Sequence, residues 1–254
     1  MAITIKSERE IELMAEAGKI LERVHNELEK ALHPGMSTKD IDTLGEKIIR
    51  SYGCIPSFLN YNGYPASICV SVNQEVVHGI PDKHRIIHEG DIVSLDAGVI
   101  YKGYHSDAAR THAVGEVSEE AKKLIQVTKE SFFEGIKFAK AGNHLFDISG
   151  AIGRYAEERG YGVVRDLCGH GIGTALHEAP EIPNYEVGRK GVKLRPGMTL
   201  AIEPMINIGT YEVDWLDDDW TVVTRDGSLS AHYENTILIT EGEPRILSLT
   251  CENE

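Results

Sequence analysis

Two aspartates in the segment 92–114, IVSLDAGVIYKGYHSDAARTHAV, have a spacing that suits a shared cation. A Tyr-Lys-Gly turn separates two mostly apolar strands here, and Asp96 and Asp107 lie almost equidistant from it. We expect them within a residue of opposite each other across a hairpin, where carboxylates repel unless a cation or a proton lies between them. The pair alone is equally compatible with one hydrogen-bonded turn aspartate and one surface aspartate.

Three further residues of ligand type strengthen the case for a metal. Glu203 ends the apolar strand TLAIE, and Glu234 begins another apolar strand in SAHYENTILIT. His170 lies in CGHGIG, where the flanking glycines would let the backbone approach a metal or a substrate closely. Taken singly, each has an ordinary interpretation as a rim glutamate or as a structural histidine in a glycine-rich turn.

The donor set of four carboxylates and one imidazole predicts the kind of metal. It suits divalent Mn, Fe, Co or Zn and excludes a structural zinc site built from cysteines. Charge balance favours two ions, because the charges of two divalent cations offset those of four carboxylates, as in a paired-metal hydrolase. A site with one ion stays open on the residues alone.

Two histidines, His78 in HGIP and His177 in HEAP, are not needed as ligands. An imidazole near a metal-bound carbonyl can donate a hydrogen bond to the developing oxyanion or to the leaving amide nitrogen. The alternative is that both are structural residues of His-Pro turns.

An internal repeat relates the two parts of the chain, which we divide at about residues 1–115 and 116–254 of a single catalytic domain. A shift of 107 lays PGMSTKDIDTLGEKIIRSYG on AGNHLFDISGAIGRYAEERG and HEGDIVSLD on RPGMTLAIE, so that Asp96 aligns with Glu203. Since a carboxylate recurs at the same strand position, core packing does not explain it. The shift also aligns Gly35 with Gly142, Gly53 with Gly160 and Gly90 with Gly197.

Each half is expected to contain two helices followed by strands. Hydrophobic periodicity and capping residues predict helices that open at Ser7 and Ser118, with second helices at 37–51 and 144–159. The strand-like segments are 66–73, 91–99, 104–114, 163–168, 198–208, 219–224 and 229–240. An Asp-Gly pair within 225–228 is typical of a tight hairpin turn. This order predicts an α+β fold with a curved antiparallel sheet, helices on its outer face and a cleft between the halves.

Composition excludes several classes of protein. No apolar run approaches the ~18 residues of a membrane span, and the N-terminus does not resemble a signal peptide. The net charge of −14 argues against non-specific nucleic-acid binding. The cysteines show no CxxC pattern, which favours a reducing cytoplasm: Cys54, Cys69, Cys168 and Cys251.

Several long blocks, in order, resemble the signature segments of type I methionine aminopeptidases over essentially the whole chain. They are SICVSVNQEVVHGIPD, VSLDAGVIYKGYHSDAARTHAVG, CGHGIGTALHEAPEIPNY, RPGMTLAIEPMIN and DDWTVVTRDGSLSAHYENTILIT. The resemblance implies the pseudo-twofold pita-bread fold. It also implies an enzyme that hydrolyses the N-terminal methionine from nascent proteins when the second residue is small, with a hydroxide bridging two metal ions as nucleophile.

The resemblance assigns roles to the residues already named. Asp107 and Glu234 would bridge two divalent ions, while Asp96 completes the shell of one ion and His170 with Glu203 that of the other. Glu203 would also relay the proton of the attacking water. His78 and His177 would contact the substrate amide and stabilise the tetrahedral intermediate.

The methionine pocket also follows from the resemblance. It would be lined by Phe58, Tyr61, Tyr64, Cys69, Leu176 and Trp220. Phe58 and Leu176 depart from the family, whose members often carry Cys and Phe there, which leaves the selectivity of the pocket open. Ordinary core packing is the alternative for each of these residues taken singly.

The expected partner is the N-terminus of a nascent polypeptide, with transient ribosome association, no membrane and no specific nucleic acid, and we expect a cytoplasmic monomer. One alternative is a prolidase or aminopeptidase P, which shares the fold and the ligands. Another is a pita-bread domain that binds peptides without catalysis. The physiological metal and the range of second residues stay open.

Overall fold

The computed structural model describes residues 2–249, so Cys251 lies outside the described residues. Its α-helices are α1 (Glu8–Ala31), α2 (Thr38–Ser51), α3 (Glu119–Ile136) and α4 (Leu145–Glu157), and a short 3-10 helix covers Tyr61–Gly63. Side chains cap the helices where the sequence predicts it. Before α2, for example, the Ser37 hydroxyl accepts from the Asp40 amide and the Asp40 carboxylate accepts from the Ser37 amide.

The strands form one large antiparallel sheet and two small ones. The large sheet has the order β1-β4-β5-β14-β9-β7-β8, with β2 on β4 and β15 on β14, and the small sheets are β13-β10-β6 and β11-β12-β3. The strands are β1 (Ile55–Pro56), β2 (Ile68–Val72), β3 (Glu75–Val77), β4 (Ile92–Tyr101), β5 (Tyr104–Ala113), β6 (Gly162–Val163), β7 (Gly169–Gly171), β8 (Glu178–Ile182), β9 (Thr199–Ile202), β10 (Met205–Asn207), β11 (Val213–Trp215), β12 (Val222–Thr224), β13 (Ser230–His232), β14 (Glu234–Leu238) and β15 (Arg245–Ile246).

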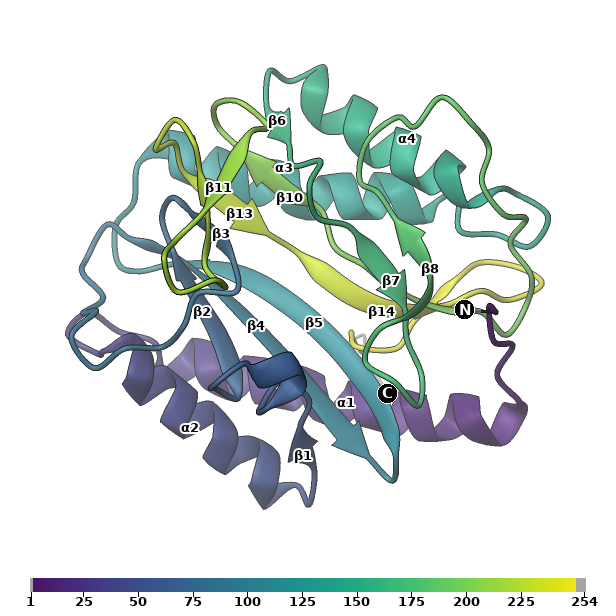
Figure 1. Ribbon diagram of the computed structural model, residues 1–254, viewed down its shortest axis with the longest axis horizontal. Coiled ribbons are helices and arrows are strands. Elements are labelled where there is room, and N and C mark those ends of the chain that lie inside the picture. The colour runs from purple at the N-terminus through teal and green to yellow at the C-terminus, as the bar shows by residue number, and fades with distance from the viewer. Residues whose placement is uncertain (1, 250–254) are drawn as a thin grey trace.

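The helices flank the strands in two pairs (Figure 1). Helices α1 and α2 pack on β2, β4 and β5, and helices α3 and α4 pack on β6, β10 and β13. Each pair encloses its own apolar core, which contains Leu21, Ile49 and Leu95 in the first half and Phe132, Ile148 and Ile202 in the second. Side chains alternate along a strand, so the opposite face of these strands can carry polar side chains.

The repeat seen in the sequence recurs in the backbone. The aligned glycines share the left-handed region of the backbone. The φ angle is 92° at Gly35 and 94° at Gly142, and it is 93° at Gly90 and 85° at Gly197. Isolated β-bridges also obey the shift of 107, because Ser37 pairs with Ile86 and His144 pairs with Lys193. Two related halves thus place equivalent strands on the two sides of the site.

Four expectations about the strands were wrong in detail. The segment 229–240 forms two strands, β13 and β14, which lie in different sheets. The Asp-Gly turn does not close a hairpin, because β12 pairs with β11 and β3 while β13 pairs with β10. The segment 198–208 is interrupted at Glu203 and Pro204, since proline cannot donate to a ladder. The segment 163–168 forms only the short strand β6.

Among residues 2–249, no helix is long and apolar enough to cross a membrane. The cysteines Cys54, Cys69 and Cys168 are free thiols.

Candidate metal centre and substrate cavity

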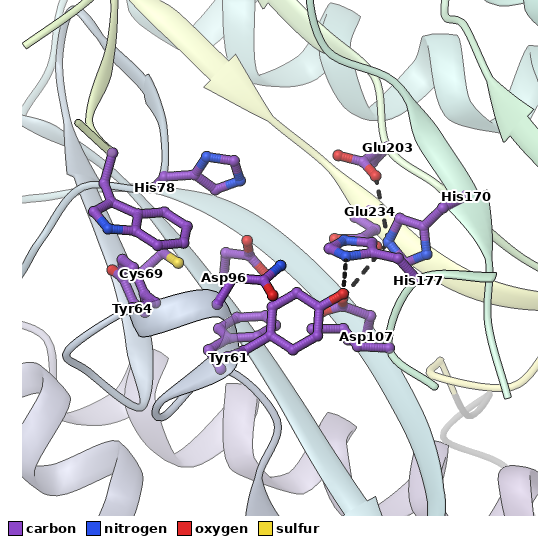
Figure 2. Close-up of a pocket in the computed structure, with 14 residues that line it drawn as sticks. Tyr61, Tyr64, Cys69, His78, Asp96, Asp107, His170, His177, Glu203 and Glu234 are labelled. Atoms are coloured by element: carbon purple, nitrogen blue, oxygen red, sulfur yellow. Dashed lines mark hydrogen bonds and ion pairs between the residues drawn. The ribbon is translucent and has the colours of Figure 1, made fainter. Parts of the chain in front are cut away.

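Five adjacent strands of the large sheet bring the predicted ligands together (Figure 2). Asp96 lies in β4, Asp107 in β5, Glu234 at the start of β14, Glu203 directly after β9 and His170 in β7. These strands are consecutive in the sheet order. His170 is thus part of a strand, paired with Ala201 of β9, rather than of a turn.

The hairpin register differs from the expectation. Asp96 pairs with Ala109 and Asp107 pairs with Gly98, so the aspartates are diagonal neighbours two positions apart. Because the side-chain period of a strand is two, both carboxylates still point to the same face. The error came from the turn, which contains two residues between the paired Tyr101 and Tyr104.

The geometry of the group fits a metal ion. Asp107, His170 and Glu234 each offer one ligand atom, and these three atoms all lie within 4.8 Å of one another. The Nε2 atom of His170 lies 3.9 Å from Oδ2 of Asp107 and 3.7 Å from Oε1 of Glu203. These separations exceed hydrogen-bond length, as expected of atoms arranged around a common cation.

Burial and mutual repulsion make the carboxylates hard to ionise without a cation. Burial raises the pKa of Asp96 to about 7. Burial and the neighbouring Asp96 carboxylate raise the pKa values of Asp107, Glu203 and Glu234 well above their ordinary range. Buried oxygens of Asp96, Asp107 and Glu234 also have no hydrogen-bond partner within the protein. Divalent cations among these residues would satisfy the oxygens and remove the repulsion, so the residues fit such ions.

His170 is prepared to act as a neutral ligand. Its Nδ1 lies 2.9 Å from the carbonyl oxygen of Gly171, which fixes the Nδ1–H tautomer and directs the Nε2 lone pair toward the carboxylates. Burial lowers the pKa of this imidazole to about 3, so the ring stays unprotonated at neutral pH.

His78 and His177 line the same cavity as the carboxylate group (Figure 2). The backbone of His78 has φ of 59°, a left-handed conformation that is uncommon for a non-glycine residue and often marks a functional site. Burial lowers the pKa of His78 to about 4. The Nδ1 atom of His177 lies 2.7 Å from the Tyr61 hydroxyl, and its ring centroid lies 4.2 Å from that of His170.

A cavity of about 130 Å³ opens directly from the carboxylate group. All six residues predicted for the methionine pocket line it: Phe58, Tyr61, Tyr64, Cys69, Leu176 and Trp220. Aromatic contacts stiffen its wall, with the Tyr64 and Trp220 ring centroids 5.1 Å apart, edge to face. The cavity therefore joins an apolar, aromatic compartment to a cluster of metal-ligand type.

Sequence reasoning missed two residues of this region. Asn62 lines the cavity. His232 is 2% exposed, and its Nε2 lies 3.9 Å from Oε2 of Glu203 and 4.0 Å from Oε2 of Glu234. The only signal for His232 was its position two residues before Glu234, although β13 and β14 are separate strands.

Comparisons with known proteins agree with this geometry. Residues 12–241 match the model of metallopeptidase family M24. The methionine aminopeptidase of Clostridium acetobutylicum is 59% identical, over 98% of this chain and 100% of its own length. The crystal structure of methionine aminopeptidase from Thermotoga maritima has a TM-score of 0.96 at 47% identity, covering 98% of this chain and 100% of that chain.

The chain belongs to metallopeptidase family M24, and it groups there with the methionine aminopeptidases. The prediction of a pita-bread metallopeptidase is therefore confirmed, and with it the use of divalent metal. The Xaa-Pro dipeptidase of Bacillus anthracis shares the fold at 27% identity with a TM-score of 0.78, over 98% of this chain but 63% of that chain.

Proposed function

We propose that the protein removes the N-terminal methionine from polypeptides whose second residue is small, with two divalent metal ions. The observation that carries this proposal is the shared lining of one cavity, in which aromatic and apolar side chains meet carboxylates of ligand type. Such a compartment suits a flexible thioether, because sulfur–aromatic contacts contribute about 0.3–1.5 kcal/mol.

Asp96, Asp107, His170, Glu203 and Glu234 would hold the ions. When bound, divalent ions polarise a carbonyl and lower the pKa of a coordinated water toward about 7. The charge of the four carboxylates supports two ions rather than one, since all four are buried or nearly so. Mn, Fe, Co and Zn all suit this donor set.

Glu203 would move the proton. Its side chain is 14% exposed, more than that of Asp107 or Glu234, so its carboxylate faces the space that substrate enters. The residue would accept a proton from the attacking water and deliver it to the leaving amine, a role in which positioned carboxylates contribute roughly 10²- to 10⁴-fold.

His78 and His177 would bind the substrate amide. Burial lowers the pKa of each imidazole, which keeps both neutral and able to donate one hydrogen bond. If the Tyr61 hydroxyl donates to Nδ1 of His177, the proton of that ring lies on Nε2, where it can reach a developing oxyanion. The two rings would hold the carbonyl of the first residue from its two sides.

The cellular setting is part of the same proposal. We infer that the substrate is the N-terminus of a nascent polypeptide, met by a cytoplasmic monomer in transient association with the ribosome. The net charge of −14 argues against non-specific binding to nucleic acid.

Metal add-back tests this function. The enzyme would be stripped with a chelator and supplied anaerobically with Mn, Fe, Co or Zn, and each sample assayed on Met-Ala-Ser and on an Ala-Pro peptide. We expect metal-restored release of methionine with little Ala-Pro cleavage. Ala-Pro cleavage without methionine release would assign the protein to the prolidase activity, and no turnover with any metal would favour a binding domain.

A further inference from the structure

Lys6 is a buried cation outside the metal centre and outside the lining of the substrate cavity. Its side chain is 5% exposed, and its Nζ lies 2.5 Å from Oε2 of Glu178, whose side chain is 11% exposed. The Thr4 hydroxyl donates to the same carboxylate oxygen at 2.6 Å. Because a buried charge that loses its partner is strongly unfavourable, Lys6 and Glu178 hold each other in place.

Glu178 directly follows His177 and begins strand β8. His177 lies in the bend just before this strand, one peptide bond from Glu178, so an anchor on the Glu178 side chain restricts the position of the His177 backbone and ring. The backbone ladder constrains this segment weakly, because the register shifts: Gly171 pairs with Glu178, whereas His170 pairs with Glu181. The anchor on the Glu178 side chain therefore acts together with the Tyr61 hydroxyl in fixing the direction of His177.

The packing around this ion pair leaves little freedom. A Cβ atom at Gly173 would lie 2.5 Å from Oε1 of Glu178 and 2.5 Å from Cε of Lys6. Lys6 is itself fixed, since its amide donates to the carbonyl of Gly197 at 2.8 Å and the next residue, Ser7, is the N-cap of α1. The pair thus ties the start of the first helix to the segment 172–178 of the second half.

We propose that Lys6 is a positioning residue for His177. Its ion pair with Glu178 holds the segment 172–178 so that Nδ1 of His177 stays 2.7 Å from the Tyr61 hydroxyl and its ring faces the substrate amide. The inference rests on the proposed function, because it assumes that His177 acts on the substrate. It adds a residue that touches neither substrate nor metal.

Four variants test the proposal on the metal-loaded enzyme: Lys6→Met, Glu178→Gln, the double variant, and Lys6→Arg. We expect each neutralising variant to lower kcat on Met-Ala-Ser roughly 10- to 100-fold, part of the contribution of a positioned proton donor. KM should stay within about twofold and metal content should not change, since the ligands are untouched. The double variant should be no worse than a single one, and Lys6→Arg should restore most of kcat.

Lys122→Met is the matched control, because Lys122 forms an exposed ion pair with Glu119 on α3. It should leave kcat and KM unchanged. Unchanged kcat in both neutralising variants, or a loss of kcat that follows metal content, would overturn the proposal.

A crystal structure of Lys6→Met gives a readout that is independent of activity. The proposal requires His177 to move away from Tyr61 while the five ligand side chains keep their places. An unmoved His177 would refute it. If the wild-type enzyme itself released no methionine, the proposed function would fail, and this structural result would still decide whether Lys6 positions His177.

Discussion

The carboxylate cluster should make the metal-free protein less stable as the pH rises, and Asp96 provides the test. In the folded chain its pKa is raised from 3.8 to about 7 by burial. Asp96 therefore stabilises the fold fully below pH 3.8, where it is protonated in both states. This contribution is lost as the pH rises through 7, where the folded state must hold the charged form. At 1.36 kcal/mol per pH unit, the difference amounts to about 4 kcal/mol.

The variant Asp96→Asn removes that charge. In chelator-treated protein we expect it to raise the free energy of unfolding at pH 8 by up to about 4 kcal/mol and to change it little at pH 4. With metal bound the sign should reverse, because the variant loses a ligand. Urea unfolding followed by circular dichroism measures both states.

Asp217→Asn is a suitable control, since Asp217 is exposed. Its free energy of unfolding should match that of the wild type at both pH values. If the metal-free Asp96→Asn variant were no more stable than the metal-free wild type at pH 8, the buried Asp96 carboxylate would not destabilise the fold in the way proposed.

Four other changes have defined outcomes. Glu203→Gln should lower kcat by about 10²- to 10⁴-fold with metal content retained on elemental analysis, and near-normal turnover would remove its proton-transfer role. His177→Ala should lower kcat about 10²- to 10³-fold, and loss of metal instead would make it a ligand. Trp220→Ala removes the edge-to-face partner of Tyr64. Its main effect should be a lower kcat/KM for methionyl peptides, with a lower melting temperature as the lesser effect. Gly18→Ala should cost about 1–3 kcal/mol in urea unfolding, because its Cβ would meet the backbone carbonyl of Leu247, and unchanged stability would show that this contact relaxes freely.

Much of the fold could be predicted because the sequence repeats its backbone requirements. Glycines with positive φ recur at the aligned positions, and the caps of α2 and α4 recur with them as Ser37 with Asp40 and His144 with Asp147. Helices α2 and α4 consequently begin within a residue of the predicted starts. Local signals of this kind act within a few residues and need no knowledge of the tertiary structure.

Strand pairing was predicted less well, because it depends on partners far away in the chain. The two-residue turn at 102–103 set a register in which Asp96 and Asp107 are diagonal rather than opposite. The Asp-Gly turn looked like a hairpin, yet β12 finds its partners at β3 and β11. Pairing energies between distant strands are not encoded in the turn alone.

The candidate site was predicted where the residue type itself limits the chemistry. Carboxylates on otherwise apolar strands point to a cation, and the structure places Asp96, Asp107 and Glu234 on the lining of one cavity. His232 and Lys6 could not be predicted in the same way. Their surroundings come from segments that only tertiary packing brings near them, such as Glu203 beside His232.

A competition experiment measures which first residue the enzyme prefers to remove. The metal-loaded enzyme would receive Met-Ala-Ser, Leu-Ala-Ser and Ala-Pro-Ser together at equal concentration, and mass spectrometry would follow which peptide loses its first residue. We expect methionine to be released first, with a kcat/KM advantage of up to about tenfold over leucine, because the aromatic cavity favours the thioether. Equal release of leucine, or faster cleavage of Ala-Pro-Ser, would contradict this expectation.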